Sequence, residues 1–155
     1  MHYTAPHSPW DRENHPAEIY DAYYRDCQFR STPNVPAHPW QINSAPIPGD
    51  DEKRRGILSG YFSAVTGADA NTGRIVDWLE RHGLRENTLV IFTSDNGMNM
   101  GHHGIYGKGN GTFPLNMYDT SVKVPMLISQ PGRVPEGRVC GALLSHYDVR
   151  PTLLE

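Results

Sequence analysis

The sequence predicts an α/β domain, and three observations carry this prediction. A long segment at 52–82 repeats apolar residues at helical spacing. Two short runs at 89–94 and 124–129 are rich in apolar and β-branched residues and have the length of buried strands. Helix, strand, loop, strand and helix thus follow one another in a chain of 155 residues, which is long enough for one domain with a hydrophobic core.

The first third of the chain, residues 1–56, is expected to be mostly irregular. Prolines interrupt it at positions 6, 9, 16, 33, 36, 39, 46 and 48. This density of proline favours an extended loop lying over a surface. The exception is a short helix at 16–24, with Pro16 near its first turn.

The helix at 52–82 has recognisable ends. The acidic run at 50–52 lies where the helix dipole favours negative charge. At 81–83, Arg-His-Gly combines a basic last turn with a glycine of the kind that commonly ends helices. The apolar positions near helical spacing between these ends are Ile57, Tyr61, Val65, Ala68, Ile75 and Leu79.

The second strand leads into the last expected helix. After 124–129 the chain turns at Pro131–Gly132 and enters a helical segment within 143–155. Ser145 or Asp148 would cap this helix, with Pro151 in its first turn.

Composition narrows the classes of function. A net charge of -3 and a pI near 6.2 provide no basic surface of the kind that nucleic acid requires. No apolar run approaches the roughly 20 residues that span a bilayer, and no signal-peptide pattern is visible at the N-terminus. Cys27 and Cys140 have neither zinc spacing nor the number needed for a disulfide framework, and they leave the compartment open.

Polar residues that suit a metal ion follow the strand at 89–94. Asp95 and Asn96 lie at its C-terminal end, and ligands of open α/β sheets bind outside the carboxyl ends of the strands. A carboxylate and an amide oxygen suit calcium or magnesium, which prefer oxygen ligands. Asp-Asn-Gly is equally good turn chemistry, so these residues alone leave both interpretations open.

The loop that follows adds cationic groups to a glycine-rich backbone. Lys108 lies between two glycines, so the backbone can come close to a ligand while the ammonium meets an anionic oxygen. A lysine in a loop is more often simply solvated. His102 and His103 suit ligands, acids or surface residues, and the sequence does not tell which one faces inward. A cation site beside an anion site points to hydrolysis of a charged ester.

Five segments in order resemble the type I sulfatases of the alkaline-phosphatase superfamily. They are TAPHSPWD near the start, the segment from Gly60 to Thr88, LVIFTSDNG with GHHGIYGKG, YDTSVKVPMLISQP, and LLSHYDVRPTLLE. Each motif is weak alone, and together they cover most of the chain, with 25–56 the least diagnostic part. The resemblance implies an α/β sandwich with a mixed, largely parallel central sheet, covered by the helix at 52–82.

The resemblance also implies roles for five residues. Asp95 and Asn96 would be two of the four side-chain ligands of a divalent cation, usually calcium. Lys108 would contact the sulfate and neutralise charge on the ester oxygen as the bond breaks. His7 would hydrogen-bond the sulfate or the leaving-group oxygen and protonate it. His103 would contact the substrate, since many relatives keep a histidine there.

Parts of the family pattern are missing from this chain. The family's nucleophile is a cysteine or serine that is converted to formylglycine, and neither Cys27 nor Cys140 has the right neighbours or position. Nothing before His7 supplies the paired aspartates that complete the cation site. Residues 1–155 are therefore interpreted as a partial sulfatase catalytic domain, cut at both ends, without its nucleophile region and C-terminal subdomain and inactive alone.

Other hypotheses remain open at this point. Within the enzyme class, the alternative is a phosphodiesterase or phosphonate hydrolase of the same superfamily, although Asp-Asn at 95–96 leans towards a sulfatase. In another class, the chain is a non-catalytic binding module on this scaffold. The expected substrate is a sulfated sugar or small molecule of unspecified identity. Parents of this type are commonly exported or lysosomal, and the sequence does not decide the compartment.

Overall fold

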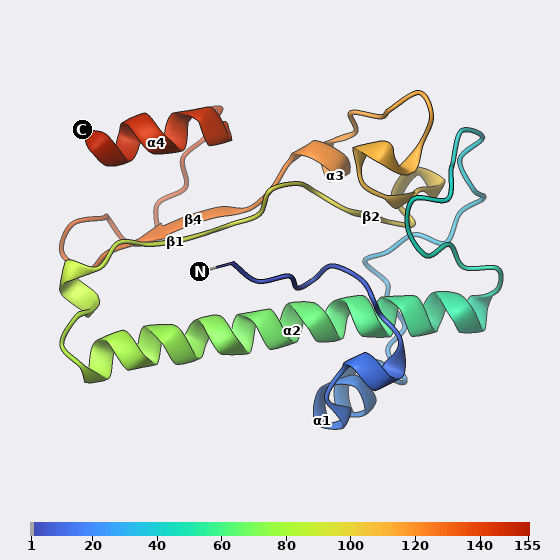
Figure 1. Cartoon of the computed structure of the whole chain (residues 1–155), viewed down its shortest axis with the longest axis horizontal. Helices are drawn as coiled ribbons and strands as arrows, with labels where there is room; N and C mark the ends of the chain where they lie inside the picture. Colours follow the sequence, from blue (N-terminus) through green and yellow to red (C-terminus); the bar gives the residue numbers. More distant parts are fainter. Residues whose placement is uncertain (1) are drawn as a thin grey trace.

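The computed structural model describes residues 2–155 (Figure 1). The α-helices are α1 (Ala17–Ile19), α2 (Asp51–Arg81), α3 (Asp119–Val122) and α4 (His146–Leu154). The strands are β1 (Val90–Thr93), β2 (Asn99–Met100), β3 (Tyr106–Gly107) and β4 (Met126–Ser129). A π-helical turn at Tyr20–Tyr24 continues α1, and short 3-10 turns lie at Arg12–Asn14, Arg85–Asn87, His102–Gly104 and Gly109–Gly111. The chain combines helices with strands, which confirms the α/β class.

The long helix α2 begins and ends close to where the sequence predicts. The carboxylate of Asp50 accepts a hydrogen bond of 2.7 Å from the backbone N–H of Lys53, so one free donor of the first turn is satisfied. At the other end, Gly83 adopts a φ of +65°, in the left-handed region that favours glycine. The last helix also starts as expected, because Ser145 caps α4 and shares a reciprocal capping box with Asp148. Pro151 lies inside α4 rather than in its first turn, because the helix begins only at His146.

The two predicted strands pair with each other in antiparallel register. Val90 lies opposite Ser129, and Thr93 lies opposite Met126. Within residues 2–155 both strand pairings, β1 with β4 and β2 with β3, are antiparallel, so the parallel strands implied by the resemblance are not seen in this part of the protein. The connecting segment 94–125 contains the hairpin β2–β3 and the short helix α3, and it lacks the long crossover helix that parallel neighbours usually need.

The hydrophobic core lies on the first half of α2 and not under β1 and β4. It consists of Trp10, Phe29, Ile57, Leu58 and Met100, with partly buried Tyr24, Cys27, Tyr61, Phe62 and Met98 packed around it. Figure 1 shows α2 running lengthwise along β1 and β4, yet neither strand contributes a residue to this cluster. The expectation that the helix covers the strands is thus only partly met, because the irregular N-terminal segment takes up the buried face of α2.

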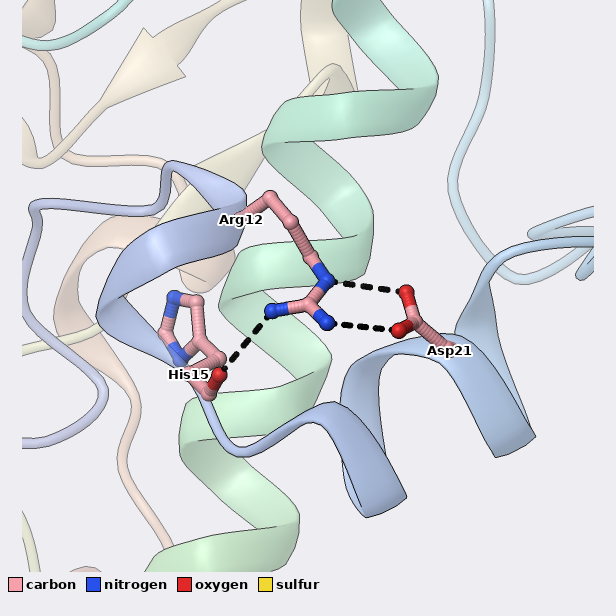
Figure 2. Close-up of polar contacts among 3 residues, drawn as sticks. All are labelled: Arg12, His15 and Asp21. Carbon is pink, nitrogen blue, oxygen red and sulfur yellow. Dashed lines mark hydrogen bonds and ion pairs between the residues drawn. The ribbon is translucent and has the colours of Figure 1, made fainter.

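An ion pair fixes the shape of this N-terminal segment. The guanidinium of Arg12 donates to both carboxylate oxygens of Asp21, at 2.8 and 2.6 Å, and to the backbone oxygen of His15 at 3.4 Å (Figure 2). The hydrogen bond from Arg12 lowers the pKa of Asp21, while burial lowers the pKa of His15. The pair is solvent-exposed, so its role is to hold the turn at Arg12–Asn14 against Tyr20–Tyr24 rather than to add much stability.

Several large apolar side chains on the strands remain uncovered. Phe92 is 39% exposed, Leu127 64% and Ile128 42%, although β1 and β4 are the most apolar segments of the chain. Within residues 2–155, no helix is both long enough and apolar enough to cross a bilayer. The uncovered strand faces instead resemble surface that other parts of a sheet would bury.

We expect the chain expressed alone to be marginally stable or to aggregate. Exposed strand edges and apolar faces favour association between copies of the chain. Size-exclusion chromatography and thermal unfolding of the isolated chain test this. A monomer that unfolds cooperatively at a high temperature would favour the stand-alone module over the truncated enzyme.

Candidate functional site

The end of β1 carries the side chains of Asp95 and Asn96. Asp95 is exposed, and among residues 2–155 its carboxylate has only a long contact of 3.5 Å with the hydroxyl of Ser94. The side-chain N–H of Asn96 donates to the backbone oxygen of Gly97 at 2.9 Å, and its amide oxygen Oδ1 accepts no hydrogen bond from the described residues. His146 of α4 donates through Nε2 to the backbone oxygen of Ser94 at 2.8 Å and so ties the last helix to this strand end.

These oxygen atoms are of the type that a hard cation binds, but two are too few to fill its coordination sphere. Calcium takes about 6–8 oxygen ligands, and here one carboxylate and one amide oxygen are available. Among residues 2–155, no three His, Cys, Asp or Glu side chains come close enough together to hold a metal ion. Asp95 and Asn96 thus provide two side-chain oxygens at this strand end, and the described residues hold no cluster of His, Cys, Asp or Glu beside them.

Lys108 lies on a loop whose backbone is hydrogen-bonded, and its ammonium group is unpaired among the described residues. The residue is half-buried, and its backbone oxygen accepts a hydrogen bond of 2.9 Å from Gly111 N–H. Within the described residues, its ammonium has no hydrogen-bond or ion-pair partner. Just before it, burial raises the pKa of the Tyr106 hydroxyl. A free ammonium on an ordered glycine loop suits an anionic ligand.

His7 lies on an exposed loop that the hydrophobic core holds in place. Trp10, three residues later, is buried in the same cluster as Met100 and donates through Nε1 to the backbone oxygen of Pro6 at 2.8 Å. The His7 Nδ1 atom lies 2.9 Å from the backbone oxygen of Ser8. Because a carbonyl only accepts, Nδ1 carries a proton, and Nε2 is the ring nitrogen that remains for a ligand.

The two neighbouring histidines differ in exposure. The Nδ1 atom of His102 is buried without a partner among the described residues. His103 is exposed, has a φ of +58°, and stacks on Tyr118 with ring centroids 4.0 Å apart. His103 is thus the more accessible of the two histidines. The sequence alone does not tell which of them is accessible.

An open groove is lined in part by Tyr118, the ring on which His103 stacks. Its volume is about 290 Å³, and it is lined by His38, Trp40, Pro114, Leu115, Asn116, Met117 and Tyr118. His38 lies edge-on to both Trp40 and Tyr118, so the groove is largely aromatic and apolar on this side. An aromatic wall of this kind suits the flat face of a ring.

The structure joins the Asp95–Asn96 segment to the Lys108 loop through residues that sequence reasoning missed. Gly97 N–H donates to the backbone oxygen of Ser121 at 3.0 Å. The hydroxyl of Ser121 in turn lies 2.6 Å from both Asn99 and Asn116, whose side chains reach the backbone around Lys108. These residues are small, polar and spread over the chain without periodicity, so no sequence pattern marks them.

The fold and the site together define an α/β protein with a candidate cation-binding strand end and a candidate anion-binding glycine loop. The comparison with known families shows to which family this protein belongs. The family model described as "Sulfatase" matches residues 1–155. The chain therefore belongs to the sulfatase family, as the sequence motifs indicate.

Individual relatives agree with this assignment. An endo-4-O-sulfatase of Bacteroides thetaiotaomicron is 33% identical, over 96% of this chain and 26% of that protein. An arylsulfatase of Clostridium perfringens is 29% identical, over 100% of this chain and 32% of that protein. A solved structure from work on glycosaminoglycan metabolism in B. thetaiotaomicron has a TM-score of 0.73 and 28% identity, covering 97% of this chain and 28% of that one. The chain thus spans less than a third of the length of these relatives.

Proposed function

We propose that this chain is part of the catalytic domain of a formylglycine-dependent sulfatase, which hydrolyses sulfate esters. The observation that carries the proposal is the match of the sulfatase family over the whole chain. The free ammonium of Lys108, on the loop that follows the strand end, supports it. The formylglycine hydrate, which would lie in another part of the longer protein, would supply the nucleophile.

In this proposal, the residues of the chain bind and neutralise the sulfate. Lys108 contacts a sulfate oxygen and stabilises the negative charge that develops on the ester oxygen as the bond to sulfur breaks. His7 offers Nε2 to the leaving-group oxygen. In its protonated form, His7 would donate the proton on Nε2 to the departing oxygen.

The substrate class that we propose is a sulfated sugar or a sulfated small molecule with a ring. The exposed ring of His103 stacks on Tyr118, one of the residues that line the aromatic groove, and would contact the part of the substrate next to the sulfate. The similar solved structure comes from work on the metabolism of glycosaminoglycans in B. thetaiotaomicron, which supports a sulfated carbohydrate as the substrate.

Asp95 and Asn96 complete the proposal as two ligands of a divalent cation, taken to be calcium. The cation would hold the sulfate oxygens beside Lys108 and withdraw charge from them. The free carboxylate of Asp95 and the free Oδ1 of Asn96 support this assignment. The remaining ligands belong to the longer protein in this proposal.

Calcium should bind the isolated chain weakly. Two side-chain ligands leave most of the coordination sphere to water, so we expect a dissociation constant in the millimolar range or weaker. Isothermal titration calorimetry of the isolated chain measures this, with Asp95→Asn as the matched control. Micromolar binding abolished by Asp95→Asn would mean that other ligands within the chain complete the site.

The direct test of the proposed function uses the longer protein that contains this chain. We expect it to release sulfate from 4-nitrophenyl sulfate and to carry an in-frame Cys-x-Pro-Ser-Arg type motif before residue 1. Faster hydrolysis of a phosphodiester or a phosphonate monoester would favour the related hydrolases. An upstream region without the motif, together with no hydrolysis at all, would favour the binding module.

A further inference from the structure

Three consecutive carbonyl groups around Lys108 accept hydrogen bonds from two buried asparagines. The side-chain amide of Asn99 donates to the Gly107 oxygen at 3.1 Å. The side-chain amide of Asn116 donates to the oxygens of Lys108 and Gly109, at 3.2 and 3.1 Å. Asn99 is 0% exposed and Asn116 is 8% exposed, so both amides are shielded from water. The backbone on either side of Lys108 is thus held at successive positions.

Ser121 of α3 joins the two asparagines. Its hydroxyl donates to Oδ1 of Asn116 at 2.6 Å and accepts from Nδ2 of Asn99 at 2.6 Å. The backbone carbonyls that surround each Nδ2 can only accept, which fixes the orientation of both amides and hence the direction of each hydrogen bond. The hydroxyl of Thr120 donates to the side-chain oxygen Oδ1 of Asn99. Every strong donor and acceptor of this network is therefore satisfied, which makes it rigid.

The same serine connects the network to the cation side of the site. The Ser121 backbone oxygen accepts a hydrogen bond from Gly97, the residue that directly follows Asn96. A Cβ on Gly97 would lie 2.2 Å from the backbone oxygen of Thr120, so the strand end and α3 approach as closely as glycine allows. Movement of α3 would shift the Asp95–Asn96 segment and the Lys108 loop together.

A lysine between two glycines has a mobile backbone unless other groups restrain it. Gly107 has a φ of +137°, a conformation that L residues rarely adopt. An ammonium group stabilises a developing charge best when it is already in position, because no reorganisation is then needed during the reaction. The buried amides of Asn99 and Asn116 lie outside the loop and supply this restraint on its backbone, which the glycines of the loop, having no side chains, do not supply.

We propose that Asn99, Asn116 and Ser121 are positioning residues, here called the asparagine clamp, which hold Lys108 against the anion site in register with Asp95 and Asn96. This inference rests on the proposed function, since it concerns the charge that Lys108 brings to the sulfate. The clamp does not touch the substrate and acts through Lys108.

A double-mutant cycle on the full-length sulfatase tests the clamp. Asn116→Ala and Ser121→Ala should each lower kcat about tenfold or more, because misplacement of a reacting group by about 1 Å costs up to roughly a hundredfold. In a Lys108→Ala background the same changes should cost less than about threefold, because contacting residues that act as a unit are not additive. A merely structural role predicts equal losses in both backgrounds, and that result would overturn the proposal.

Ser63→Ala is the matched control. This serine lies in α2, is 1% exposed and has a hydroxyl without a partner among the described residues, so the change removes a buried hydroxyl that makes no hydrogen bond to the clamp. It should leave kcat unchanged. If Asn116→Ala does not fold, the cycle with Ser121→Ala decides, because that change removes a single oxygen atom.

Amide hydrogen exchange provides a readout that does not depend on activity. Gly111 N–H is bonded to the Lys108 oxygen, so its exchange should become faster in Asn116→Ala while the amides of α2 keep their protection. Unchanged exchange at residues 107–111 would contradict the clamp. If the wild-type protein hydrolyses no sulfate ester, the proposed function fails, and the exchange measurement alone decides whether the clamp exists.

Discussion

Replacing Lys108 with alanine is expected to lower the turnover of an aryl sulfate by roughly a hundredfold or more in the full-length enzyme, the scale of losing one preorganised charge. The half-buried ammonium has no hydrogen-bond or ion-pair partner among the described residues, so it is available to an anionic ligand. Steady-state kinetics measures the effect. An enzyme that keeps its turnover without Lys108 would remove the central residue of the proposed site.

His7→Ala should have an effect of similar size that depends on the leaving group. Loss of a general acid costs typically about 10²–10⁴-fold. The loss should shrink for a very acidic phenol, because its oxygen needs little protonation to depart. A series of aryl sulfates with phenols of different acidity measures this dependence. An equal loss across the series would mean that His7 binds the sulfate without donating a proton.

His102→Ala is the control for both changes and should do far less than either. Its ring is partly buried, and its Nδ1 faces protein rather than an open ligand site. If His102→Ala were as damaging as Lys108→Ala, the glycine loop would have been misassigned, with His102 and not His103 facing the substrate.

A single methyl group at position 60 is expected to destabilise the protein strongly. Alanine normally stabilises the interior of a helix by about 0.5–1 kcal/mol relative to glycine. At Gly60, however, the new Cβ would lie 1.9 Å from the backbone oxygen of Trp10. Backbone atoms cannot rotate away as a side chain can, so the N-terminal segment would have to move. Overpacking of this kind costs typically about 1–3 kcal/mol, occasionally more.

Gly73→Ala, in the same helix, is the matched control and should change the free energy of unfolding in the opposite direction. Nothing lies within 4 Å of its Cβ position, and the residue is exposed. We expect Gly73→Ala to raise the free energy of unfolding slightly and Gly60→Ala to lower it. Thermal unfolding of the full-length protein measures both.

Because Trp10 anchors the loop of His7, Gly60→Ala should also lower turnover, whereas Gly73→Ala should not. Equal stability of the two variants would mean that the N-terminal segment does not pack on α2 as described.

The long helix, the last helix and the two longer strands were predictable from the sequence, because local patterns carry local signals, whereas β2, β3 and α3 were not predicted. The helix at 52–82, observed at Asp51–Arg81, follows from apolar spacing and from residues whose side chains or backbone favour helix ends. The strands at 89–94 and 124–129 appear as Val90–Thr93 and Met126–Ser129, shorter at their ends, where pairing stops. The membership of the sulfatase family was likewise predictable, because its motifs lie in consecutive residues. The roles of Asp95, Asn96, Lys108, His7 and His103 stay predictions.

Only the tertiary structure decided how these segments meet. The antiparallel pairing of β1 with β4, the packing of Trp10 on Gly60 and the stacking of His103 on Tyr118 join residues far apart in the chain. The asparagine clamp does the same, since Asn99 and Ser121 are separated by 22 positions and share no periodicity. Hydrogen bonds of this kind depend on direction and burial, which arise when the chain folds, whereas helix and strand patterns depend on the spacing of side chains along it.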